Sequence, residues 1–241
     1  MKKFFVFLMF VGVIALAACG STGGGDDGSG CGEACGDGSC GGGGKMDSSQ
    51  STIDMYVNGT IKAQYWVQVH AEPKAGQYWE TAGEAYGTTS TQRWQVAKVD
   101  GDMAVIEWEM KSDSEYAMSD YVIAFQVDLS VTTAGDVNVS KAWIGKPGEA
   151  GAEIAVMEKP DATCGGATSD YEITNEDFTD VEMGGGKWSG NLQTIKGEGF
   201  EMKTWTAKDG WFNGVIKTEM NGATQSELKA FGEDATPLLK W

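Results

Sequence analysis

Histidine and basic residues are scarce in this chain of 241 residues. Its single histidine, His70, excludes most Ser-His-Asp, Cys-His and multi-histidine metal sites within one chain. Only 18 Lys and Arg stand against 35 Asp and Glu, which gives a net charge of −17. Binding to nucleic acid or to anionic lipid head groups needs clustered positive charge, so neither is expected.

The first residues have the layout of a secretory signal. Lys2 and Lys3 are followed by the uncharged stretch 4–17, and then by Ala18 and Cys19. The apolar stretch is shorter than the about 20 residues that a membrane-spanning helix needs. We therefore expect export rather than a membrane span.

The sequence Leu16-Ala17-Ala18-Cys19 resembles a bacterial lipobox. The resemblance implies that residues 1–18 are a signal peptide and that Cys19 carries a covalent lipid, usually with a further acyl chain such as palmitate. Several acyl chains make such an anchor stable. Gly20 stands where an Asp would resemble an inner-membrane retention signal, so we expect the outer membrane, facing the periplasm or the cell surface. An ordinary cleaved signal with a fortuitous cysteine is the alternative.

Residues 19–45 are expected to form a tether rather than a domain. Between Gly20 and Gly44, 13 of 25 residues are Gly, and no large apolar side chain occurs. Such a segment cannot form a core and is predicted to be disordered.

Cysteines at C-x3-C-x4-C spacing lie inside this tether. The spacing matches no zinc pattern, and an exported compartment favours disulfides over metal binding. Two disulfides are possible, with three pairings that the sequence does not distinguish. The candidate disulfide cysteines are Cys31, Cys35, Cys40 and Cys164.

Residues 46–241 alternate between apolar and polar side chains, which predicts antiparallel sheet. The clearest hairpin joins Arg93–Val99 to Met103–Met110 through Asp100-Gly101. The prediction is a single all-β domain, mainly antiparallel, with one curved sheet or half-barrel of about nine to eleven strands.

Other segments of this domain carry weaker predictions. Asn221-Gly222 indicates a tight hairpin turn, because both residues tolerate positive φ. A strand is expected at Tyr65–His70, and a long loop at 159–186 with a short helical piece at 175–181. No helix of three turns is predicted.

Four stretches resemble a group of uncharacterised exported bacterial proteins of LolA/LolB-like type. They are Ala142–Gly148, Gly199–Trp205, Asp209–Lys217 and Ser226–Gly232. The resemblance implies an antiparallel half-barrel around an apolar cavity, and it implies no catalytic residue.

A half-barrel of this kind has a concave face that an apolar ligand can occupy. Strand alternation places one set of apolar side chains on that face, and few helical segments are available to fill it. The predicted ligand face comprises Ile106, Trp108, Ile123, Phe125 and Ile216.

These observations favour a lipid-anchored, non-enzymatic envelope protein without cofactor or metal. Its β-domain is expected to bind an apolar small molecule or an envelope protein. The alternative is a carbohydrate-binding module that uses exposed tryptophans, with Trp211 and Trp79 the freest. Glu107 and Glu109 have the spacing of a glycosidase pair, but alternation assigns both to the solvent face.

Calcium binding by acidic loops is left open, since neither loop has the twelve-residue pattern. The residues concerned are Asp113, Glu115, Asp120, Asn175, Glu176, Asp177 and Asp180.

Overall fold

The computed structural model describes residues 48–85, 88–114, 119–160 and 171–241. These residues form one helix and eleven strands. In chain order they are α1 (Ser48–Val57), β1 (Tyr78–Ala85), β2 (Thr88–Asp100), β3 (Met103–Ser112), β4 (Tyr121–Asp128), β5 (Val139–Gly145), β6 (Ala152–Ile154), β7 (Glu172–Met183), β8 (Gly186–Gly197), β9 (Phe200–Ala207), β10 (Val215–Met220) and β11 (Ala223–Gly232).

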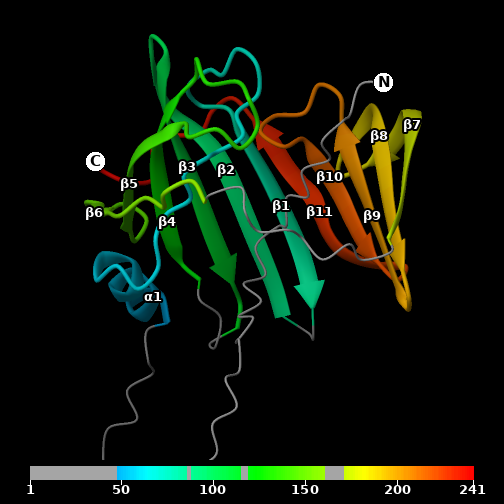
Figure 1. Cartoon of the computed structure of the whole chain (residues 1–241), viewed down its shortest axis with the longest axis horizontal. Coiled ribbons are helices and arrows are strands. Elements are labelled where there is room, and N and C mark those ends of the chain that lie inside the picture. The colour runs from blue at the N-terminus through cyan, green and yellow to red at the C-terminus, as the bar shows by residue number, and fades with distance from the viewer. Residues whose placement is uncertain (1–47, 86–87, 115–118, 161–170) are drawn as a thin grey trace, which may run out of the picture. The chain divides into compact units, whose positions relative to one another are not determined.

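All eleven strands belong to one sheet, in the order β6-β5-β4-β3-β2-β1-β11-β10-β9-β8-β7. Two antiparallel meanders, β1–β6 and β7–β11, are joined where β1 pairs with β11 (Figure 1). The sheet does not close, because β6 and β7 remain edge strands on opposite sides. The predicted all-β class, open sheet and strand number are confirmed.

Tight turns set the register of the hairpins. Asn221 and Gly222 have φ values of 50° and 79°, so they form the two-residue turn between β10 and β11. Gly101 has a φ of 59° in the turn between β2 and β3. Both hairpins were predicted from these residues.

One face of the sheet, called the inner face here, carries the main hydrophobic core. Helix α1 contacts β5 and β6, and the crossing segment, residues 58–77, connects α1 to β1. Ile53 and Tyr56 of α1 and Val67 of the crossing segment pack into this core. These two elements therefore cover part of the inner face.

The opposite, outer face is crossed by the C-terminal segment, residues 233–241. Leu238 and Leu239 pack there with Val105 and Val122 in a second, smaller core. The Lys240 backbone N–H donates to the Glu149 carbonyl and the Lys240 carbonyl accepts from Gly151, which ties the segment to the β5–β6 turn. The central strands are thus buried on both faces.

Two local predictions are wrong. Tyr65–His70 is extended without being a strand. Residues 48–57 form a helix of 10 residues, which is shorter than three turns. Strand β7 lies within the stretch predicted to be a loop with a helical piece at 175–181. Its many carboxylates protect this exposed edge from pairing with other chains.

Candidate functional site

The predicted ligand face lies on the inner face, but inside the core. Ile106, Ile123, Phe125 and Ile216 are buried, and Trp108 packs against the same core. Helix α1 and the crossing segment contribute to that core, so the concavity is filled at these positions. The expectation that few helical segments leave an open pocket there is not supported by this packing.

Aromatic rings form a continuous series of contacts across the inner face. Trp79, Trp94 and Trp108 are register partners on neighbouring strands, and Trp79 also pairs with Phe231 of β11. Trp94 and Trp108 are stacked, with ring centroids 5.9 Å apart. Beyond Trp79, the row continues to rings that are less covered.

The less covered rings are Trp188, Trp211 and Phe231, which we call the aromatic platform. Phe231 lies 5.1 Å from Trp188 and 6.3 Å from Trp211, measured between ring centroids. Phe231 is 43% exposed, whereas Trp79 beneath it is only 2% exposed. The sequence identified Trp211 correctly as partly free, but its assignment of Trp79 as free is wrong.

His70 fastens the crossing segment beside this platform. Its Nδ1 accepts the Phe212 backbone N–H at 3.2 Å, which leaves Nε2 to donate to Gln77 Oε1 at 2.7 Å. Its ring also stacks on Trp211, at 5.9 Å between centroids. Burial lowers the pKa of His70, with the Gln77 hydrogen bond opposing in part. The neutral ring therefore holds the crossing segment in place through these two hydrogen bonds.

A cavity of about 450 Å³ adjoins Trp211 and His70. It lies between the crossing segment and the connection from β9 to β10. Its lining also includes Gln68, Lys208 and Asn213. An aromatic ring beside amide and charged groups suits a polar ligand that has an apolar face.

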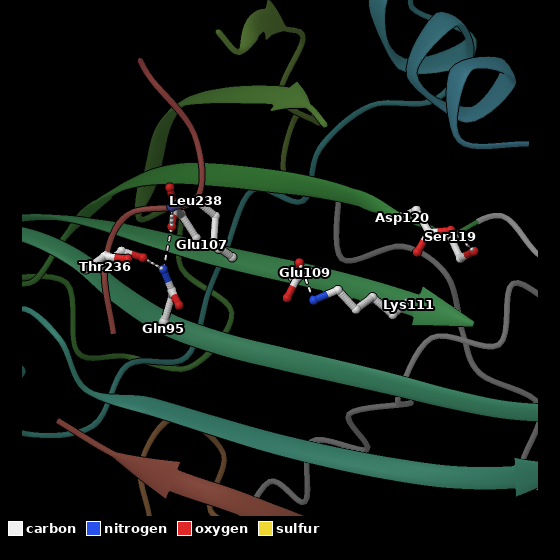
Figure 2. A network of polar contacts seen from close by, with 8 residues as sticks. All are labelled: Gln95, Glu107, Glu109, Lys111, Ser119, Asp120, Thr236 and Leu238. Carbon is white, nitrogen blue, oxygen red and sulfur yellow. Dashed lines mark hydrogen bonds and ion pairs between the residues drawn. The ribbon is translucent and has the colours of Figure 1, made fainter. Parts of the chain in front are cut away.

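On the outer face, Glu107 is a fully buried carboxylate at the centre of a polar network (Figure 2). Its Oε2 accepts from Gln95 Nε2 and from the Leu238 backbone N–H, both at 2.7 Å. Its Oε1 accepts from the Leu239 backbone N–H at 3.0 Å and from Trp241 Nε1 at 3.1 Å. Four donors thus compensate its buried charge and fix the C-terminal segment.

Glu109, two residues further along β3, is only 3% exposed and forms an ion pair of 2.9 Å with Lys111 (Figure 2). The prediction that Glu107 and Glu109 face solvent is therefore wrong. Alternation along β3 is correct, but the C-terminal segment packs over the outer face at Glu107. The carboxylate of Glu107 therefore binds the C-terminal segment and has a structural role.

The remaining predicted sites are the metal sites, the lipidation site and the disulfides. The described residues contain no group of three or more His, Cys, Asp or Glu placed to bind a metal ion. The lipidation site and all candidate disulfide cysteines lie outside the described residues: Cys19, Cys31, Cys35, Cys40 and Cys164. Their roles stay predictions.

Fold and site together define an all-β domain built on one open sheet, with an aromatic platform and cavity at one end of its inner face. No protein-family model matches the chain, and no curated protein matches it significantly. Within the part of the chain that the structure describes, no helix has the length and apolar character needed to cross a membrane.

Proposed function

We propose that this chain is an exported, lipid-anchored binding module of a bacterial envelope, and that its β-domain binds carbohydrate at the cavity beside Trp211. The anchor rests on the lipobox-like sequence ending at Cys19. The binding role rests on one observation above all. A partly exposed tryptophan, stacked on His70, lines a cavity together with amide and charged side chains.

Sugars are amphipathic, and this lining matches them. Their C–H faces stack on aromatic rings, while their hydroxyl groups need hydrogen-bonding partners at the ring edge. Trp211 supplies the ring, and Gln68, Asn213 and Asp209 supply amide and carboxylate groups. The same ring is a poor fit for a purely apolar molecule, because so much of the lining is polar.

An apolar ligand at the predicted face is the less favoured alternative. It would have to displace Ile106, Ile123 or Phe125 from packed positions in the core. We assign no catalytic role, since Glu107, half of the candidate glycosidase pair, is bound to the C-terminal segment on the other face of the sheet.

The test is an isothermal titration calorimetry experiment in which neutral oligosaccharides are added to the full chain. Trp211→Ala should abolish binding while far-ultraviolet circular dichroism stays unchanged. Trp205→Ala is the matched control, because Trp205 is also partly exposed but carries Lys217 over its ring. Equal loss in both variants, or saturable binding of a fatty acid but of no sugar, would refute the proposal.

A further inference from the structure

A row of uncharged polar side chains crosses the C-terminal meander, on the face opposite to the core residues Phe178, Trp188 and Ala207 of β7, β8 and β9. Its five members are partners in register on adjacent strands. None is buried. This polar row comprises Asn175, Gln193, Thr204, Thr218 and Ser226.

The polar row continues beyond β11 onto the N-terminal meander. Gly83 of β1 lies beside Ser226 and pairs with Ser90 of β2, which in turn pairs with Ser112 of β3. Neighbouring strands are about 4.8 Å apart, so the five-strand part alone is about 19 Å long. Its length and direction suit an extended chain that lies across the strands.

Hydrogen-bonding capacity along the polar row is largely unused. Gln193 Nε2 donates to Asn175 Oδ1 at 3.4 Å, which is a long bond. The hydroxyl groups of Thr204, Thr218 and Ser226 make no side-chain hydrogen bond with the described residues. These groups are free to bind hydroxyl groups of a ligand.

Three ion pairs of the same strands lie on the opposite face, whereas Asp177 of β7 lies on the face of the polar row, two residues from Asn175. On the opposite face, Glu201 pairs with Lys196 at 3.2 Å and with Lys203 at 2.9 Å, and Lys217 pairs with Glu219 at 2.7 Å. The polar row has no charged member in a chain of net charge −17. It is therefore complementary to an uncharged partner, and the strong net charge opposes self-association.

An apolar row runs alongside the polar row. Ile173, Ile195, Met202 and Met220 are register partners on β7, β8, β9 and β10. Ile173 and Met220 are exposed at the two ends of this row, whereas Ile195 between them is buried. Parallel tracks of hydroxyl and apolar groups match a sugar chain, which presents hydroxyl edges and C–H faces.

We infer that the polar row binds a neutral polysaccharide chain lying across strands β7–β11. The inference rests on the proposed carbohydrate-binding function, but it concerns a second site, separate from the cavity beside Trp211. The strand spacing is close to the length that each sugar unit adds to an extended chain. Binding to this row should therefore strengthen with chain length until the ligand spans the row.

Affinity electrophoresis of the full chain tests the inference, with hydroxyethylcellulose, galactomannan and dextran as neutral polymers and alginate as the charged one. At least one neutral polymer should retard the chain, and alginate should not. The double variant Thr204→Val and Thr218→Val should weaken retardation about tenfold, since two hydrogen bonds are lost. Thr174→Val, an exposed threonine on the face of β7 that does not carry the polar row, should behave as the unaltered chain.

Failure of this site and failure of the cavity site give different results. Trp211→Ala should abolish binding of short oligosaccharides while the polymer still retards the chain. Retardation that survives in the double threonine variant, or no retardation by any neutral polymer, would overturn the inference. Self-association of the chain that the double variant disperses would also overturn it, since the row would then bind a second copy.

Discussion

Replacing Glu107 by Gln should destabilise the domain strongly, although the change is nearly isosteric. The carboxylate is fully buried and accepts four hydrogen bonds, two at each oxygen. In the variant, one oxygen becomes an NH₂ group that faces two donors instead of accepting from them. Two bonds to a charged acceptor are lost and two buried donors are left without partners. The expected cost is about 3–5 kcal/mol.

This loss would be a large part of the total stability, which is usually about 5–15 kcal/mol for a protein domain. Urea unfolding followed by circular dichroism measures it. The control is Glu109→Gln on the same strand and face. Glu109 makes an ion pair with the exposed Lys111 and accepts no hydrogen bond from the described C-terminal segment, so the cost of this change should be clearly smaller than that of Glu107→Gln. Carboxypeptidase should also remove Trp241 faster from the Glu107 variant, because its C-terminal segment is released.

The reasoning is wrong if both glutamate variants unfold at the same urea concentration. If Glu107→Gln does not fold, Trp241→Phe replaces it, since that change removes the hydrogen bond from Nε1 and keeps an aromatic ring at the position. We expect Trp241→Phe to lower the free energy of unfolding by about 1 kcal/mol. No effect at all would contradict the role of Glu107 as the anchor of the segment.

Three further predictions concern the core, the histidine and the anchor. Phe125→Ala should cost about 3–5 kcal/mol in urea unfolding because Phe125 is buried, and a cost as small as that of Phe231→Ala would mean that Phe125 lines an open pocket instead. Burial lowers the pKa of His70, so the folded state favours the neutral ring. The free energy of unfolding should therefore fall as pH drops below about 6.5, and His70→Gln, measured by urea unfolding at each pH, should lack that component. Cys19→Ala should leave the membrane fraction or accumulate as uncut precursor on immunoblots; a processed variant that still sediments with membranes would refute the lipobox interpretation.

Much of the sheet was predictable, because its core strands obey simple alternation. In β3 and β4, Ile106, Ile123 and Phe125 all face the inner core as the period of two requires. Turn residues such as Asn221-Gly222 then locate the hairpins. Strand alternation and turn residues are both visible in the local sequence, so they could be found without knowing the tertiary structure.

Strand β7 and helix α1 escaped prediction because their local signals are weak. Strand β7 is rich in Asp and Glu, which are uncommon in strands, and it is exposed on both faces. Helix α1 is short and turns Ser49 and Thr52 toward the core beside Ile53, which hides the apolar periodicity. Both elements are held by their partners rather than by intrinsic preference.

The candidate site was only partly predictable, for a different reason. Glu107 is bound by residues that follow it by 131 positions or more, and no local pattern shows that the outer face is covered there. The cavity likewise joins Gln68 and His70 to the β9–β10 connection, far along the chain. Trp211 could be singled out from the sequence as one of the freest tryptophans, and it does line the cavity.

Hydrogen–deuterium exchange of the full chain, with and without a saturating neutral oligosaccharide, tests the binding site most directly. The ligand should slow exchange in residues 68–71 and 206–214, which line the cavity. The outer-face segment 233–241 should exchange at the same rate in both samples. Protection confined to that segment, or no protection of 206–214 by any sugar that binds, would contradict a carbohydrate site beside Trp211.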